Sequence, residues 1–359
     1  MIVKLGSLIS EYSVRNKADE DIPVYSVTNE QGFCTGYFSK EVASQDRTTY
    51  KIVPRGCFAY NPSRINVGSV DVQECEDRVI VSPLYVVFSV DEKLNRRYLL
   101  HYLKSDITLT YIKAYASGSV RDNLKFSILK GFPINLPSAE EQEQIVATLD
   151  GIEHLIALRK EELASLDELV KSRFIELFGD PVYNTKKLPT KRLAELGSLD
   201  RGRSQHRPRN APELLGGPYP LIQTGEVANA GLYITGYSNT YSELGLKQSK
   251  MWKAGTLCIT IAANIAQTSI LTFDACFPDS VVGFIPGDSI SAIYMHYWFG
   301  FFQKILEEQA PQVAQKNINL KILSDLSVVV PNQEQQKDFV AFVEQTDKSK
   351  LCGEMEVAA

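Results

Sequence analysis

The sequence lacks the short motifs that most catalytic and metal sites require. Its six cysteines include no Cys-x-x-Cys pair, and its four histidines have no metal-ligand spacing. No P-loop, Gly-x-Ser-x-Gly motif or glycine-rich loop for a methyl-donor cofactor occurs. In FAYNPSR, Ser63 and Arg64 stand where an adenine methyltransferase would have a second proline and a base-stacking aromatic residue. We therefore expect a non-catalytic chain with no cofactor and no metal.

Long apolar runs are also absent. No stretch of eighteen apolar residues suggests a membrane helix, and the first residues, MIVKLGSLISEYSVRNK, are too polar for a signal peptide. Widely separated cysteines without a pairing pattern suit a reducing compartment. These features predict a cytoplasmic protein with no membrane partner.

The net charge of −5 is unevenly distributed along the chain. Residues 138–180 have a net charge of −7 and residues 332–359 a net charge of −3, so the remaining residues together are at +5. Two mildly basic blocks therefore alternate with two acidic segments, and the overall charge hides this division.

An internal repeat appears when the sequence is shifted by 194 positions. The stretch RDNLKFSILKGFPINLPSAEEQ (121–142) then lies over QKNINLKILSDLSVVVPNQEQQ (315–336). Earlier in each half, DIPVYSVTNEQG (21–32) resembles GPYPLIQTGEVANAG (217–231). Two echoes in the same order indicate duplication, and each copy is too long for a solenoid repeat. We expect two tandem domains, each followed by a helix.

Both repeats end in a helix start. Ser138 with Glu141, and Asn332 with Gln335, can form capping boxes. From the first start, apolar residues continue in a 4-3 rhythm until Gly179-Asp180-Pro181, with Arg159 and Arg173 at the two remaining seam positions. This rhythm predicts a helix of about 40 residues and about 60 Å. We expect an antiparallel coiled coil with the second helix, which we expect to end near 351. An ordinary long surface helix is the alternative. The stripe proposed for partner binding is Ile145, Leu149, Leu163, Leu166, Val170 and Leu177.

The two basic blocks have similar patterns. Short β-branched runs separated by turn residues precede helical stretches near 95–115 and 290–309. We therefore predict an α+β fold with two tandem α+β domains. The expected division is 1–136 for the first domain, 137–180 for the central spacer helix, 181–330 for the second domain and 331–359 for a shortened distal helix.

An arginine-rich loop is the main candidate for a binding surface. DRGRSQHRPR (200–209) contains Arg201, Arg203, Arg207 and Arg209, and Gly202 and Pro208 favour a loop. Arginine can pair with phosphates or bidentately with guanine edges. A solvated loop without a ligand is the alternative.

Polar loops occur at matching places in both blocks. The candidates in the first block are Tyr60, Asn61, Ser63, Arg64 and Asn66, and those in the second are Asn264 and Gln267. Amide side chains after a strand suit adenine edges, and they equally suit ordinary turns. Arg121 and Lys316 lie in the loops that precede the repeated motif.

This ordered set of features resembles the specificity subunit of type I restriction-modification systems. The resemblance rests on LPSAEEQEQIVATLD, on the spacer ending LVKSRFIELFGDP, and on VPNQEQQKDFVAFVEQTDKSK after a second block, and it covers essentially the whole chain. It implies two target recognition domains that read the halves of a bipartite site in double-stranded DNA. It also implies helices that fix the gap and dock two methyltransferase subunits, with restriction (motor-nuclease) subunits joining for cleavage.

Two other functions are compatible with parts of the sequence. A non-catalytic two-domain scaffold on a coiled coil could bind protein or glycan, although the +5 balance of the blocks and the arginine loop disfavour it. A methyltransferase with divergent motifs would need the donor site that the sequence lacks.

Overall fold

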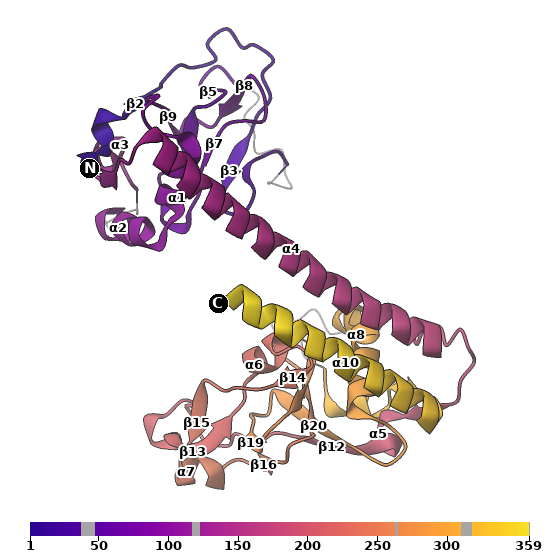
Figure 1. Ribbon diagram of the computed structural model, residues 1–359. Helices are drawn as coiled ribbons and strands as arrows, with labels where there is room; N and C mark the ends of the chain where they lie inside the picture. The colour runs from indigo at the N-terminus through magenta and orange to yellow at the C-terminus, as the bar shows by residue number, and fades with distance from the viewer. Residues whose placement is uncertain (37–46, 117–122, 263–264, 310–317, 359) are drawn as a thin grey trace. The chain divides into compact units, whose positions relative to one another are not determined.

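The computed structural model describes residues 1–36, 47–116, 123–262, 265–309 and 318–358 (Figure 1). The chain divides into two compact units, unit 1 (Met1–Ala157) and unit 2 (Leu158–Ala359). None of the helices in the described ranges is long and apolar enough to cross a membrane.

Unit 1 is built on a four-stranded antiparallel sheet with the strand order β2-β9-β6-β7. Three separate two-stranded antiparallel sheets accompany it: β3–β4, β5–β8 and β1–β10. The strands are β1 (Ile2–Lys4), β2 (Ile9–Glu11), β3 (Ser26–Thr28), β4 (Gly32–Cys34), β5 (Lys51–Pro54), β6 (Phe58–Tyr60), β7 (Val70–Val72), β8 (Arg78–Val81), β9 (Val86–Val90) and β10 (Pro133–Asn135). The helices are η1 (Leu5–Ser7), η2 (Ile65–Val67), α1 (Arg96–Lys104), α2 (Asp106–Ala116) and α3 (Phe126–Leu129).

The core of unit 1 lies where α1 packs with the sheet. Phe58 and Phe88 stack with ring centroids 5.1 Å apart, and both are fully buried. Leu99 and Leu103, four residues apart on α1, belong to the same core because that spacing places both on one helix face. Asn95 caps α1 by accepting hydrogen bonds from the backbone N–H groups of its second and third residues.

Unit 2 contains a five-stranded sheet with the order β12-β20-β17-β18-β14 and a four-stranded sheet with the order β15-β13-β19-β16. The strands are β11 (Thr190–Arg192), β12 (Gly197–Arg201), β13 (Leu215–Leu221), β14 (Tyr233–Ile234), β15 (Asn239–Tyr241), β16 (Met251–Trp252), β17 (Leu257–Thr260), β18 (Thr268–Leu271), β19 (Ala275–Cys276), β20 (Val281–Pro286) and β21 (Ser327–Val329). The helices are α5 (Leu193–Leu196), η3 (Pro212–Leu214), α6 (Thr224–Asn229), α7 (Glu243–Lys247), α8 (Ala292–Gln309) and α9 (Leu320–Ser324).

The duplication expected from the sequence is visible in the topology. The order β2-β9-β6-β7 of unit 1 recurs in unit 2 as β12-β20-β17-β18, and the pair β1–β10 recurs as β11–β21. An individual side-chain hydrogen bond is repeated as well. The Tyr98 hydroxyl donates to the Asn135 carbonyl at 3.0 Å, and the Tyr294 hydroxyl donates to the Val329 carbonyl at 2.8 Å. The predicted α+β fold with two tandem α+β domains is confirmed.

Two long helices complete the chain, α4 (Ala139–Phe178) and α10 (Gln333–Ala358). The ring centroids of Phe174 and Phe178 on α4 lie 5.4 and 5.5 Å from the ring centroid of Phe339 on α10. Asp167 of α4 pairs with Lys350 of α10 at 2.5 Å. Because higher numbers on α10 meet lower numbers on α4, the helices are antiparallel within unit 2, as the heptad pattern predicted.

Two details of these helices differ from expectation. The seam uses Phe174, which is fully buried, whereas the heptad count placed Arg173 there; the Arg173 guanidinium lies over the Phe342 ring, 5.9 Å from its centroid. Helix α10 continues to Ala358 instead of ending near 351. Its last residues lack an apolar stripe, but leucine, glutamate, methionine and alanine are good helix formers.

Candidate functional site

The candidate binding loops of unit 2 leave its five-stranded sheet at one edge. Strand β12 ends at Arg201, opposite Val282, and strand β17 ends at Thr260, opposite Val281. Because the two strands run antiparallel to β20 and end at neighbouring positions along it, the arginine loop and the segment 261–267 start from the same edge.

The backbone of the arginine loop is held by hydrogen bonds to the side chains of Gln248 and Ser249. The Gln248 side-chain oxygen accepts hydrogen bonds from the backbone N–H groups of Gln205 and His206 at 2.7 and 3.1 Å. The Ser249 hydroxyl donates to the Arg203 carbonyl at 3.0 Å. At Gly202 an added Cβ would lie 2.3 Å from two carbonyl oxygens of the adjoining segment, so only glycine allows this close approach.

Three of the four arginines gather around one residue, Asp279. Arg209 pairs with its carboxylate at 2.7 Å, Arg207 lies 3.8 Å from it, and the Arg201 Nε donates to its carbonyl at 2.8 Å. Arg203 is exposed, and its guanidinium has no hydrogen-bond or ion-pair partner within the described part of the chain. The nearby Asp200 is already paired with Lys250 at 2.7 Å. The loop therefore retains a net positive charge.

The loop of unit 1 that corresponds to the segment 261–267 follows β6. The Asn61 side-chain oxygen accepts from the Ser63 backbone N–H at 3.1 Å, and the Ser63 hydroxyl donates to the side-chain oxygen of Asn123 at 2.7 Å. Arg64 is exposed, and Asn66 is half-buried. These side chains lie at the edge of the sheet that matches the arginine-loop edge of unit 2.

Tyr60 does not belong to this exposed set. It is fully buried, it meets Phe88 edge-on, and its hydroxyl donates to the Leu124 carbonyl at 3.1 Å. As the last residue of β6 it points into the core, so a DNA contact through this side chain would require the core to open. Burial also raises the pKa of its hydroxyl.

Three expected contacts, Arg121, Asn264 and Lys316, lie outside the described residues. Their neighbours in the chain are placed. The Leu124 N–H donates to the Pro62 carbonyl at 3.1 Å, and the Ile318 N–H donates to the Ile261 carbonyl at 3.1 Å. In both units the segment before the repeated motif thus joins the edge at which the candidate loops begin.

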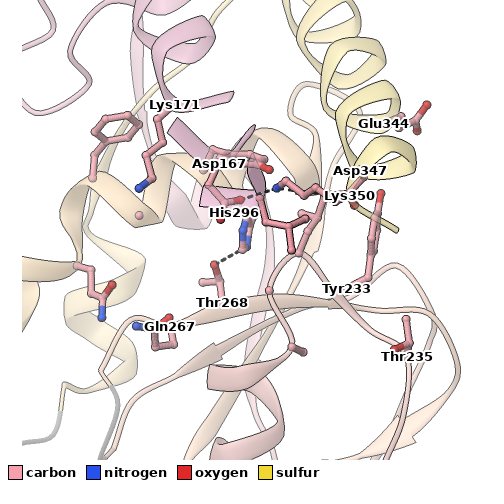
Figure 2. A pocket seen from close by; sticks show the side chains of 18 of the residues that line it. Asp167, Lys171, Tyr233, Thr235, Gln267, Thr268, His296, Glu344, Asp347 and Lys350 are labelled. Atoms are coloured by element: carbon pink, nitrogen blue, oxygen red, sulfur yellow. Dashed lines mark hydrogen bonds and ion pairs between the residues drawn. The ribbon is translucent and has the colours of Figure 1, made fainter. Parts of the chain in front are cut away.

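Gln267 lies beside the end of β17, where its carbonyl accepts from the Thr260 N–H at 2.9 Å, and it lines a cavity of about 890 Å³ in unit 2 (Figure 2). Side chains from α4, α8 and α10 line it, including the ion pair between Asp167 and Lys350. Its lining carries three acidic and three basic side chains, which gives no net attraction for phosphates: Asp167, Glu344, Asp347, Lys171, Lys348 and Lys350.

We expect His296 to make the stability of unit 2 depend on pH. Its Nδ1 lies 3.0 Å from the Thr268 hydroxyl, and burial lowers its pKa from 6.5 to about 4. Between these values the unfolded chain binds a proton that the folded chain does not, so stability is full above pH 6.5 and falls as the pH drops towards 4. Because the ring is only half-buried, we expect a loss of about 2 kcal/mol.

This pH effect is measured by chemical denaturation at pH 7 and pH 4.5. We expect His296→Gln, which keeps a polar group beside Thr268, to show the smaller difference between the two pH values. Equal pH differences for both proteins would contradict this assignment.

Within the described residues, one group of three side chains has metal-ligand chemistry: His101 on α1 with Asp150 and Glu153 on α4. The two carboxylates lie against different ring nitrogens, Asp150 at 2.7 Å from Nε2 and Glu153 at 3.4 Å from Nδ1. Arg97 also binds Asp150 at 2.6 Å and holds the pKa of that carboxyl below its usual range. This arrangement fits an ion network between α1 and α4 and not a metal centre.

The apolar residues expected to bind partners divide into two groups. Val170 is fully buried in the core of unit 2, and Leu177 packs against that core. Leu163 and Leu166 are half-buried, as is Leu149, whereas Ile145 is exposed. Helix α4 also exposes these large apolar side chains: Ile152, Leu155, Leu158, Leu169 and Ile175.

The duplicated fold and its loops correspond to a known family. The family model described as the type I restriction modification DNA specificity domain matches residues 6–168 and again residues 186–352. The chain belongs to this family of type I specificity domains.

Individual relatives agree with this assignment. The specificity domain chain is 29% identical over 171 residues to the type I restriction enzyme MjaIX specificity subunit of Methanocaldococcus jannaschii, a match that spans 43% of this chain and 38% of that relative. A chain from a structure of a type I R-M system is 18% identical, with a TM-score of 0.58. The type I restriction-modification S subunit from M. genitalium is 14% identical, with a TM-score of 0.55. Each structural match covers 100% of this chain and 92% of the other, which shows the shared fold.

Proposed function

We propose that this specificity protein reads a bipartite site in double-stranded DNA, with one half read by each unit. The observation that supports this most strongly is the duplication: each unit has its own sheet of equivalent strand order and presents polar and basic loops from the matching edge of that sheet. In unit 2, Arg203 is free to contact a base edge, while the cluster around Asp279 suits phosphate contacts. In unit 1 the corresponding candidates are Asn61, Ser63, Arg64 and Asn66.

The chain itself would carry no catalysis. Two methyltransferase subunits would modify adenine, and restriction subunits would join them for cleavage. Exposed apolar residues of α4, including Ile145, Ile152 and Leu155, would dock the methyltransferase subunits. Arg121, Asn264, Gln267 and Lys316 remain proposed DNA contacts, because they flank or lie in the loops at these sheet edges.

The choice of reading loop is tested by Arg203→Ala and by the double variant Arg201→Ala/Arg203→Ala. Each variant is expressed with its methyltransferase partner, and methylated adenines are sequenced across the host genome. We expect one half of the motif to relax or lose methylation and the other half to stay unchanged, because a bidentate arginine–guanine pair contributes about 1–3 kcal/mol to discrimination.

The matched control is Arg192→Ala, which removes an exposed arginine paired with Glu195 outside the arginine loop. It should leave both halves unchanged. If the double variant also leaves both halves unchanged, the arginine loop is not the reading loop of unit 2.

A further inference from the structure

A buried glutamine lies at the start of each long helix. Gln142 of α4 is 1% exposed and Gln336 of α10 is 4% exposed, and the two occupy matching positions of the repeat. The capping residues beside Gln142 differ from it: among the described residues, the side chains of Ser138 and Glu141 bond only within this pair, and both residues are exposed.

Gln142 joins its helix to the start of α1. Its side-chain oxygen accepts from the Asn95 N–H at 2.7 Å, and its Nε2 donates to the carbonyls of Lys93 and Pro137 at 3.0 and 3.1 Å. One amide thus connects the recognition unit, the approach to the helix and the helix itself.

Gln336 makes the same three bonds in unit 2. Its side-chain oxygen accepts from the Ser291 N–H at 3.0 Å, and its Nε2 donates to the carbonyls of Ser289 and Pro331 at 3.1 and 3.0 Å. The two glutamines therefore share one hydrogen-bond arrangement, with one accepted and two donated bonds. Only a side chain with both a donor group and an acceptor can make it.

The two copies differ in what else secures the helix. Among residues 139–157, the part of α4 that belongs to unit 1, Gln142 is the single buried residue. Helix α10 also buries Phe339, Val343 and Thr346. The contact between α4 and the rest of unit 1 therefore relies on Gln142 and on the half-buried ion network at Asp150, whereas α10 has an apolar core as well.

We propose that Gln142 is a positioning residue that fixes unit 1 on the spacer helix and thereby sets the gap between the two DNA half-sites. This inference rests on the proposed reading of a split site. Without the amide, the partly buried Asn95 N–H and the Lys93 carbonyl lose their partner, and α4 is held to unit 1 by the half-buried ion network of Arg97, His101 and Asp150, without an apolar core. Gln336 makes the same bonds, but α10 is also held by its buried residues Phe339 and Val343, so losing the Gln336 side chain should change the position of α10 less.

The functional test compares Gln142→Ala with Gln336→Ala by sequencing methylated adenines in a host that expresses each variant with its methyltransferase partner. For Gln142→Ala we expect the same two half-sites but about tenfold more methylation, relative to wild type, at sites whose gap is one base pair longer or shorter. Gln336→Ala should keep a single gap. A general loss of folding would lower methylation at all sites without changing the preferred gap.

The second measurement needs no DNA. Spin labels on Glu92→Cys and Lys160→Cys, two exposed positions, report the distance between unit 1 and α4 in a background without other reactive cysteines. We expect Gln142→Ala and Gln142→Glu to broaden or shift the distance distribution, and Gln336→Ala to leave it unchanged. An unchanged distribution in both Gln142 variants would overturn the inference. A wild-type complex whose methylated motif is continuous would instead refute the proposed function.

Discussion

Replacing Phe174 by alanine is expected to lower the free energy of unfolding of unit 2 by about 3–5 kcal/mol. The ring is fully buried, and its centroid lies 4.9–5.4 Å from the rings of four neighbours: Phe178, Tyr294, Phe301 and Phe339. Its removal leaves a cavity at the point where α4, α8 and α10 meet. Urea denaturation followed by circular dichroism measures the change.

Ile175→Ala is the matched control. Ile175 is the next residue on α4 and is 37% exposed, so its truncation should cost less than about 1 kcal/mol. Equal effects of the two substitutions would show that α4 does not share a core with α8 and α10.

Inserting seven residues of good helix-forming sequence between Ala157 and Leu158 is expected to change the DNA target. The insertion lengthens α4 by about 10 Å, which corresponds to about three base pairs along the DNA axis. Seven residues complete two turns to within about 20°, so the faces on either side stay nearly in phase. The contacts within unit 1 and within unit 2 are kept, because the insertion lies at their boundary.

Sequencing of methylated adenines measures this change. We expect the two half-sites to be unchanged, the gap to grow by about three base pairs, and the original site to lose methylation. A four-residue insertion at the same place, which rotates the two parts of α4 relative to each other, is the control and should reduce methylation more strongly. An unchanged gap after the seven-residue insertion would show that α4 does not set the spacing.

The repeat and the long apolar stripe allowed most of the fold to be predicted, because both are local patterns that can be counted along the chain. The stripe also predicted the antiparallel pairing, since it needed a partner helix. It placed Arg173 in the seam, however, where the structure uses Phe174. A strict heptad count drifts from the true helical period, and the aromatic side chains that meet from α8 and α10 decide which residue is buried.

The candidate surface was harder to predict. Composition identified the arginine loop, but the contacts with Asp279 and Gln248 join residues 42–78 positions apart. Tyr60 was expected to be exposed because it begins a polar loop, yet its position at the end of a central strand buries it. The repeated glutamines were visible in the sequence, although their partners, 45–49 positions away, were not.

The central claim is that this chain reads two separated half-sites, one with each unit. It is tested most directly by expressing the chain with its methyltransferase partner in a host that lacks other adenine methylation and sequencing every modified adenine. The account predicts one motif of two constant parts separated by a gap of fixed length, and methylation that disappears when this chain is omitted. A continuous motif, or methylation that persists without this chain, would contradict it.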